Sequence, residues 1–401
     1  MDWLLVLKIL LGIVEFPLVY YLIIPFVLAA SLWTMKHFNE EEFITGFSGK
    51  LYDFAVVATA HQQGLFIEPL VDSLKKQTYK NFVLYVICDD VKEDFSHLES
   101  DFVKIIYPNP PLHAKTKSIG LAIDSFIRKH DNIIVLDADN LMHPRYLEVM
   151  NYYFNKGYKC VQGRIKAKNL NTSAARMDAA NEIYYSFIDK YSRGKVGLSS
   201  AMWGLGFAID LEVFKKINFD HYFSGFDKKL QSEVILLVDK VAYANFAIIY
   251  DEKTSDKADL VTQRAKWLFG YFKYCKLGMK ALKRGIFFLD FDRFNYGLNH
   301  MRPPLVLLFP ASLFFLTINF FLSPILFWSL LASMIIFLVA FLMIQVRYGY
   351  DDSVWKTLPQ LPIFMVLQLF ALFRTKKAKR HTHTKHTQAV NLDEVINMYN
   401  E

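Results

Sequence analysis

Apolar residues gather in two stretches, 3–33 and 304–373, while the residues between them have the mixed composition of a soluble domain. A helix needs about 20 apolar residues to cross a bilayer, so the first stretch predicts one crossing. It is longer than a signal peptide and lacks a small-residue cleavage pattern. We therefore expect residues 1–35 to form an uncleaved membrane anchor.

The second apolar stretch predicts a transmembrane hairpin over 303–346, because Pro304–Leu322 and Ile325–Gln345 are each long enough to cross. A third membrane segment would fall within 347–375. A full third crossing would place the basic tail 376–401 on the other side of the membrane from the middle domain. That arrangement would conflict with the positive-inside tendency. We therefore favour a re-entrant or interfacial segment there.

The net charge of +7 is concentrated beside the apolar segments. Basic flanks of this kind suit anionic lipid headgroups on the cytoplasmic side. The basic tail lacks the interleaved aromatic residues of single-strand binders, so no nucleic acid is expected as a partner. Three cysteines without tight spacing predict neither a disulfide framework nor a zinc site. The simplest location is a bacterial inner or plasma membrane, with the middle domain in the reducing cytoplasm.

The middle of the chain alternates short apolar runs with helical patterns, which is typical of an α/β domain with a mostly parallel sheet covered on both faces. We place this domain at 50–255, followed by acceptor-side and interfacial helices over 256–302. The expected strands are Phe54–Ala60, Phe82–Cys88, Val103–Tyr107, Asn132–Asp137 and Lys159–Arg164, and the expected helices are 65–77, 115–129, 144–154, 172–192, 256–282 and 286–301.

Two aspartates, Asp137 and Asp139, follow the apolar run Asn132–Leu136. Side chains at i and i+2 of an extended segment point the same way, and open α/β sheets bind ligands beyond the carboxyl ends of their strands. Two carboxylates there suit Mg²⁺ or Mn²⁺, and such an ion suits a diphosphate. A plain polar exit from the strand is the alternative.

Other polar side chains follow the neighbouring strands. His61 ends the first, where it can meet a nucleotide base, although a loop histidine is the plainer reading. Asp89 and Asp90 end the second, where a carboxylate can accept from a base N–H or a ribose hydroxyl. Lys115 and Lys117 open a helix, where ammonium and free N–H groups favour a phosphate.

Two later segments complete the set. Asp227 opens a helix, where an aspartate is usually a cap. Gln263 and Trp267 share one helical face with Lys266 alongside, although an interfacial helix with a Trp at the headgroup level explains them as well.

This ordered succession resembles the membrane-bound family 2 glycosyltransferases, the group that includes cellulose, chitin and hyaluronan synthases. The resemblance covers roughly residues 50–270. It implies a GT-A fold, nucleotide binding at Asp89 and Asp90, and a metal held by the second aspartate of Asp137-Ala138-Asp139. It also implies a general base at Asp227 and a Gln-x-x-Arg-Trp signature at Gln263, Lys266 and Trp267.

Three residues depart from the family pattern. Phe226 stands where the family usually has Glu, Lys266 where it has Arg, and Gln63 where the opening loop often has Glu. Lysine keeps the charge of arginine but loses its bidentate phosphate geometry. Processive synthesis is therefore the less favoured form of the reaction.

The resemblance implies an inverting transfer from a nucleotide-diphospho sugar, most commonly a UDP-sugar, to a glycan or a lipid-linked acceptor at the membrane. Trp203 and Trp267 can stack on the acceptor sugar, and Gln263 can hydrogen-bond it. A different class remains open, namely an inactive glycosyltransferase-like scaffold, motivated by Phe226 and Lys266. The sequence also leaves open whether export or assembly subunits act with the chain.

Overall fold

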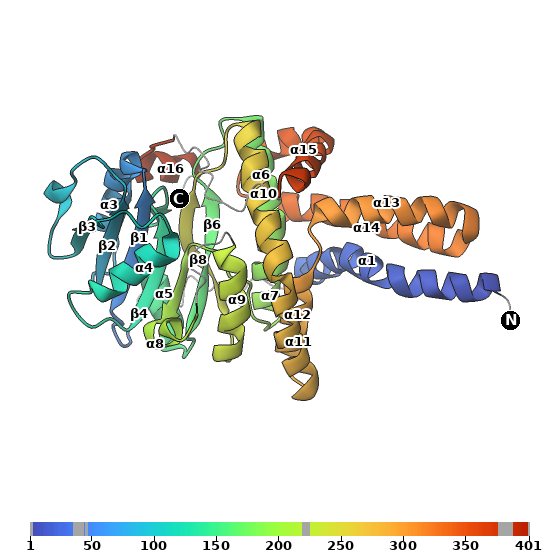
Figure 1. The fold of residues 1–401 in the computed structure, drawn as a ribbon, viewed down its shortest axis with the longest axis horizontal. Coiled ribbons are helices and arrows are strands. Elements are labelled where there is room, and N and C mark those ends of the chain that lie inside the picture. The colour runs from blue at the N-terminus through green and yellow to red at the C-terminus, as the bar shows by residue number, and fades with distance from the viewer. Residues whose placement is uncertain (1–2, 35–43, 45–46, 219–224, 376–387, 400–401) are drawn as a thin grey trace.

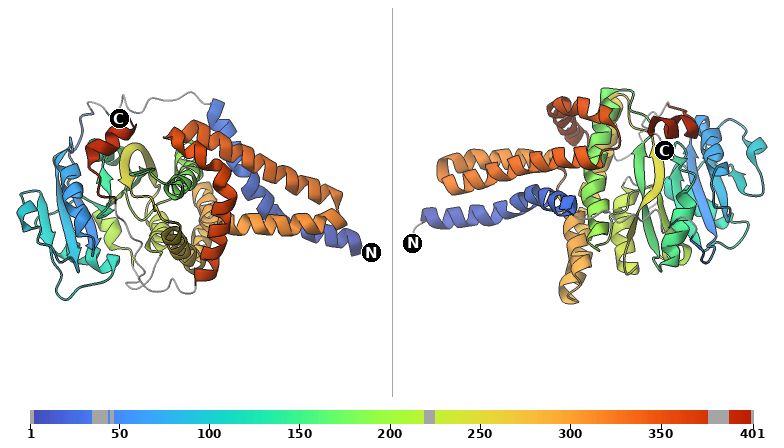
Figure 2. Two further views of the ribbon diagram at one scale, coloured as in Figure 1. Left: turned by 90° about the horizontal axis from the view of Figure 1, so that it is seen from above. Right: turned by 180° about the vertical axis from the view of Figure 1, so that it is seen from behind.

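The structure is a computed structural model, and it describes residues 3–34, 44, 47–218, 225–375 and 388–399. An α/β domain occupies one end of the molecule, and long apolar helices project from the other (Figure 1). Between them lies a layer of helices that run across the direction of the apolar helices (Figures 1 and 2).

One eight-stranded sheet forms the centre of the domain, in the order β3-β2-β1-β4-β7-β6-β8-β5. Strands β3, β2, β1 and β4 are parallel, and so are β6 and β8, whereas β7 and β5 run antiparallel to their neighbours. The mostly parallel α/β sheet predicted from the sequence is therefore confirmed. The strands are β1 Phe54–His61, β2 Phe82–Asp89, β3 Val103–Ile106, β4 Asn132–Asp137, β5 Leu141–Met142, β6 Cys160–Ala167, β7 Phe207–Asp210 and β8 Ala242–Asp251.

Helices cover both faces of the sheet. The apolar core on one face joins α3 and α5 to the strands. The core on the other face joins them to α4, α8 and α9. These helices are α3 Ile67–Lys75, α4 Lys115–Asp124, α5 Tyr146–Asn155, α8 Leu211–Lys215 and α9 Phe226–Leu237.

The crosswise layer contains α6, a π-helical segment, α7, α10, α11 and α12 (Figure 1). The single helix expected over 256–282 is wrong, because a 3-10 turn at Cys275–Leu277 divides it. α11 and α12 then form a tight hairpin, in which a Cβ on Gly285 would lie 2.3 Å from the backbone nitrogen of Phe294. The bounds are α6 Ser173–Ser186, π Phe187–Tyr191, α7 Ser192–Lys195, α10 Lys257–Tyr274, α11 Gly278–Phe287 and α12 Phe291–Met301.

The projecting helices are α1 Trp3–Thr34, α13 Leu305–Leu322 and α14 Pro324–Tyr348. Each is long and apolar enough to cross a membrane. A buried polar contact ties two of them together, since the Asn319 amide of α13 donates to the Glu15 carboxylate of α1 over 2.9 Å. Unpaired polar groups are costly in hydrocarbon, so this pair fixes the relative position of α1 and α13.

The last apolar segment, Asp352–Arg374, is a fourth candidate span by length and composition. Its α-helical part is α15 Leu361–Arg374, only 14 residues long. At 1.5 Å per residue α15 is about 21 Å long, shorter than the roughly 30 Å hydrocarbon core. Figure 2 shows α15 running across α13 and α14, and its apolar side packs on α10.

The expectation of a simple basic tail over 376–401 needs correction. Its basic part, 376–387, lies outside the described residues, but Leu392–Tyr399 forms a helix, α16, on the α/β domain. Leu392 and Val395 are buried against β5 and β8. The Tyr399 ring stacks on Tyr250, with centroids 6.0 Å apart, and its hydroxyl donates to the Ala167 carbonyl over 2.6 Å.

The docking of α16 can be tested with Val395→Asp. This change places an unpaired carboxylate where Val395 is only 2% exposed, and we expect it to weaken docking by ~2–4 kcal/mol. Hydrogen–deuterium exchange should show loss of amide protection in 388–399 with protection in β1 unchanged. Glu394→Gln, at an exposed position of the same helix, is the control. Retained protection in Val395→Asp would contradict the docked position.

Candidate active site

The carboxyl ends of β1, β2 and β4 meet at one edge of the sheet, because His61 pairs with Asp89 and Thr59 with Asp137 in register. At this edge Lys115 Nζ lies 2.7 Å from Asp137 Oδ1. The same ammonium donates to the Gly204 carbonyl over 3.1 Å. The structure thus brings the predicted phosphate-binding lysine onto the first aspartate of the Asp-x-Asp pair.

The two aspartates of this pair differ in exposure. The Asp137 side chain keeps 38% of its surface open, whereas Asp139 is only 3% exposed. Protein surrounding Asp137 raises the pKa of its carboxyl. The Lys115 ammonium opposes that rise, and the charges of Asp139 and Asp251 add to it.

Behind the pair lies a buried polar frame that sequence reasoning missed. The Asn140 amide nitrogen donates to Asp139 Oδ1 over 3.3 Å and to Asp251 Oδ1 over 3.0 Å. Lys168 donates to the Asp139 backbone carbonyl over 2.8 Å. Asp251 is 111 residues from Asn140 in sequence, so no local pattern could have identified it.

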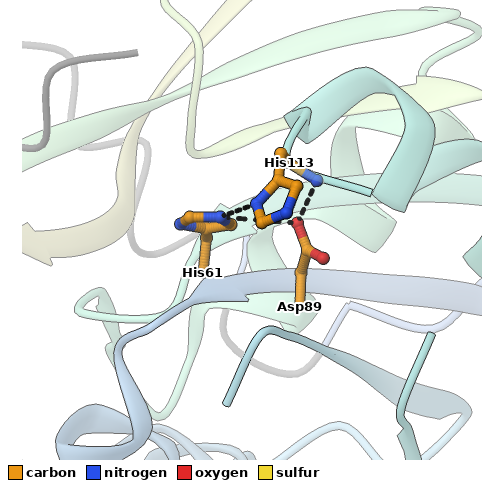
Figure 3. Close-up of side chains that lie close together, drawn as sticks. All are labelled: His61, Asp89 and His113. Carbon is orange, nitrogen blue, oxygen red and sulfur yellow. Dashed lines mark hydrogen bonds and ion pairs between the residues drawn. The ribbon is translucent and has the colours of Figure 1, made fainter. Parts of the chain in front are cut away.

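His61, Asp89 and His113 form a compact cluster at the ends of β1 and β2 (Figure 3). His61 Nε2 lies 2.8 Å from His113 Nδ1 and 3.9 Å from Asp89 Oδ2. The Asp89 carboxylate accepts the backbone N–H groups of Leu112 and His113, over 2.6 and 2.7 Å. Asp89 therefore fixes the loop before α4, and its nucleotide-binding role stays a prediction.

The neighbouring Asp90 is more accessible. The Gln62 amide donates to its carboxylate over 2.5 Å, and this bond lowers the pKa of the Asp90 carboxyl. Gln62, Asp90 and His113 all have φ between 49° and 55°. Non-glycine residues adopt such angles at a cost and often do so at functional sites. This rim of the sheet is therefore a candidate site for a base or ribose.

Two groups of side chains offer ligand atoms to a divalent cation. Among the described residues, only His61, Asp89 and His113 bring three ligand atoms within 4.8 Å of one another. The two imidazoles already hydrogen-bond each other, and the Asp89 oxygens already accept backbone N–H groups. The carboxylates of Asp137, Asp139 and Asp251 gather less tightly but carry mutual repulsion that a cation relieves, and oxygen ligands suit Mg²⁺ and Mn²⁺. The acidic group at β4 therefore fits the ion better.

The candidate base Asp227 lies in the first turn of α9. A Cβ on Gly204 would be 3.4 Å from Asp227 Cβ. The neighbouring Phe226 ring has its centroid 5.9 Å from Lys115 Nζ. Asp137, Lys115, Gly204 and Asp227 are thus continuous in space, although they come from four separate segments of the chain.

A glycine contact sets where α9 begins. Gly225 has φ +90°, and a Cβ on it would lie 2.7 Å from the Cα atom of Gly270 in α10. Only glycine combines that backbone angle with that close approach. The contact places Asp227 beside the helix that carries Gln263, Lys266 and Trp267.

The loop that carries Trp203 is organised by Gln162, which is fully buried. Its side-chain oxygen accepts the backbone N–H of Trp203 over 2.8 Å, and its amide donates to the carbonyls of Leu205 and Gly206. Lys190 Nζ lies 3.2 Å from the centroid of a Trp203 ring. Lys190 belongs to the π-helical segment, a conformation often found at functional sites.

On α10 the predicted acceptor residues have different environments. Trp267 is 51% exposed, Gln263 Oε1 is buried without a hydrogen bond, and burial lowers the pKa of Lys266. Sequence reasoning overlooked Arg264. This arginine is buried, pairs with Asp178, and lies 4.3 Å from the Trp267 ring, so a guanidinium supports the tryptophan from a position other than 266.

The α/β domain, which is of the GT-A type, thus brings an acidic strand end, a lysine at a helix start and the carboxylate of Asp227 into one region. The family model of glycosyltransferase-like family 2 matches residues 53–270. The chain belongs to this family and is a glycosyltransferase. A search of curated proteins found no match.

Among solved structures, a mannosyltransferase from Pyrobaculum calidifontis, in complex with GDP-Man and Mn²⁺, shares the fold. It aligns over 90% of this chain and 98% of its own, with a TM-score of 0.53 and 11% sequence identity. A crystal structure of S. aureus TarS aligns over 75% of this chain and 95% of its own, with a TM-score of 0.39 and 12% identity.

The glycine contact at α9 yields a test of the site geometry. Gly225→Ala should displace Asp227 while leaving α4 and β4 in place, because the added methyl group strains the backbone and meets Gly270. We expect release of nucleoside diphosphate from the donor to fall by about tenfold or more, with nucleotide binding nearly unchanged. The control is Gly120→Ala, because a Cβ at Gly120 meets nothing within 4 Å. This variant should keep both the release of nucleoside diphosphate and the binding of nucleotide. Full activity of Gly225→Ala would refute this role of the contact.

Proposed function

We propose that this chain is an inverting, metal-dependent glycosyltransferase that moves a sugar from a nucleotide-diphospho sugar, such as a UDP-sugar, to a lipid-linked or glycan acceptor at the membrane. One observation carries the proposal. Lys115 joins the Asp137 carboxylate to Gly204, against which Asp227 packs. Groups suited to the diphosphate and a group suited to the acceptor hydroxyl therefore share one cleft.

The donor would lie along the carboxyl ends of β1, β2 and β4. His61 and Asp90 are placed to meet the base and ribose, while Asp89 holds the loop that carries His113. The start of α4 offers backbone N–H groups, and Lys115 and Lys117 offer ammonium groups, to the diphosphate. Lys115 would exchange its contact with Asp137 for one with a phosphate oxygen.

Asp139 and Asp137 would hold Mg²⁺ or Mn²⁺, and a bound ion of this kind neutralises charge on the diphosphate leaving group. The Mn²⁺ in the Pyrobaculum neighbour supports this choice of ion. Asn140 and Lys168 restrain Asp139, so the carboxylates need little reorganisation to accept a cation.

Asp227 would remove the proton from the acceptor hydroxyl as its oxygen attacks the anomeric carbon. The new carbon–oxygen bond forms as the bond to the diphosphate oxygen breaks. The electron pair leaves with the nucleoside diphosphate, to which Lys115 and Lys266 supply positive charge. A single displacement inverts the anomeric configuration.

The acceptor would approach from the membrane side, where Trp203, Gln263 and Trp267 can contact its sugar. Lysine at position 266 and the small number of candidate spans favour the addition of one sugar over processive synthesis. The basic residues beside the spans favour a cytoplasmic catalytic domain.

The inactive-scaffold alternative rests on Phe226 and Lys266. Phe226 lies within reach of Lys115, so an apolar side chain does occupy part of the cleft. A scaffold would fold normally but bind no nucleotide in a metal-dependent way. The acidic group at β4 together with Asp227 favours the enzyme.

Asp227→Asn tests the base. The amide cannot accept the proton, so transfer should fall by about 10²–10⁴-fold, while titration of the purified protein should show nucleotide binding close to wild type. Asp210→Asn, a helix cap remote from the cleft, should retain activity. Loss of nucleotide binding together with transfer in Asp227→Asn would show that Asp227 belongs to the donor site.

Asp139→Ala tests the metal. Detergent-solubilised protein would be titrated with a panel of nucleoside diphosphates and nucleotide sugars, first with Mn²⁺ and then with chelator. We expect one nucleotide to bind about tenfold or more tightly with Mn²⁺, and Asp139→Ala to abolish that difference. Equal binding under both conditions would refute the metal role, and no nucleotide binding at all would favour the scaffold.

A further inference from the structure

A cavity of about 80 Å³ lies where α1 meets the catalytic domain, outside the candidate active site. Its wall includes Tyr20 and Tyr21 of α1, Arg193 of α7, and Asn295 and Asn299 of α12. Figure 1 shows these three helices together at the junction between the domain and the projecting helices. We call it the Arg193 cavity.

The residues lining the Arg193 cavity include two arginines, Arg193 and Arg302, and no acidic side chain among those that the structure describes. Arg302 has a counterion, since its guanidinium pairs with both oxygens of Asp189 over 2.8 and 2.9 Å. Arg193 is 4% exposed and forms no ion pair within the described part of the chain. A buried charge without a counterion is unusual because no ion pair offsets the free-energy cost of removing the charge from water.

The hydrogen bonds of Arg193 leave one nitrogen unsatisfied. Nε donates to the Ser199 carbonyl over 2.6 Å and Nη1 to Asn295 Oδ1 over 2.5 Å, but Nη2 is buried without a partner. Burial lowers the pKa of the Arg193 guanidinium, and the charges of Asp292 and Asp189 partly offset this. Asp292 is itself occupied by the backbone N–H and hydroxyl of Ser199.

The amides in the wall are also oriented as donors. Asn295 Oδ1 accepts from Arg193, and Asn299 Oδ1 accepts from Arg302 over 3.2 Å. Each amide oxygen is therefore used within the protein, which leaves the NH₂ groups to donate. Ile24 and Leu28 of α1 supply an apolar side to the same cavity.

We propose that the Arg193 cavity binds the phosphate group of an anionic membrane lipid. The cavity has room for a group of phosphate size, far less than the several hundred Å³ that a nucleotide-sized ligand needs. Its donors and its uncompensated guanidinium suit an anion, and its apolar side on a candidate membrane span suits a lipid chain. The site is separate from the donor cleft, and its occupancy does not depend on the proposed transfer reaction.

Two membrane components carry this chemistry, a bilayer phospholipid and a lipid-linked sugar acceptor. The full chain, purified in an uncharged detergent, would be titrated with dioctanoyl phosphatidic acid, with a short polyprenyl monophosphate, and with dioctanoylglycerol as the matched lipid without phosphate. Native mass spectrometry would count bound lipids, and calorimetry would give the affinity. Saturable binding of one phosphate-bearing lipid per chain is expected, and the tighter of the two identifies the source.

Two variants test the site by different means. Arg193→Met removes the buried charge and should weaken binding by about tenfold or more. Val196→Asp adds a negative charge to the wall at a residue that is 45% exposed, so it should fold even if Arg193→Met does not, and it should weaken binding similarly. The matched Val196→Lys and the exposed interfacial Arg284→Met should bind as well as wild type.

Equal binding of dioctanoylglycerol would overturn the proposal, because phosphate would not be recognised. Equal loss in Arg284→Met and Val196→Asp would also overturn it, because binding would then reflect general surface charge. Absence of saturable binding for both phosphate-bearing lipids would do the same. Nucleotide titration of each variant keeps this result separate from the donor site, which should be unchanged throughout.

Discussion

The ion pair between Arg302 and Asp189 joins the catalytic domain to the membrane helices. Arg302 lies directly before α13, and Asp189 lies in the π-helical segment 113 residues earlier. Both side chains are nearly buried, and removing one partner of such a pair typically costs about 3–5 kcal/mol. The same π-helical segment supports Trp203 through Lys190 and lines the Arg193 cavity through Ile188. Membrane attachment, the loop that carries Trp203 and the lipid site proposed above therefore depend on one short piece of backbone.

Much of the fold could be predicted from the sequence because its signals are local. Strands β1, β2 and β4 are continuous apolar runs, as expected for strands buried on both faces. The polar residues that follow them converge because the ends of parallel strands meet at one edge. Strands β5, β7 and β8 escaped prediction. β5 and β7 are short, and β7 follows a loop with no clear period. β8 is longer, but Asn245 interrupts its apolar run. The break between α10 and α11 escaped because the apolar pattern continues through Cys275.

The candidate site was only partly predictable, for a related reason. The sequence predicted ligand-binding roles for Asp137 and Lys115 but contained no sign that these side chains pair with each other. It assigned Asp89 to the nucleotide, whereas the backbone of Leu112 and His113 takes both of its oxygens. Hydrogen bonds between distant segments decide which polar side chains remain available to a ligand, and a single sequence does not reveal those partners.

The position of α16 has a consequence for how the protein is made. This helix packs on apolar side chains of β5 and β8, yet it follows α13 and α14 in chain order. During synthesis the side chains beneath α16 therefore stay uncovered until the hairpin has been made. Exposed apolar patches favour association with other chains. Insertion of the hairpin into the membrane would hold each nascent chain at the bilayer during that interval.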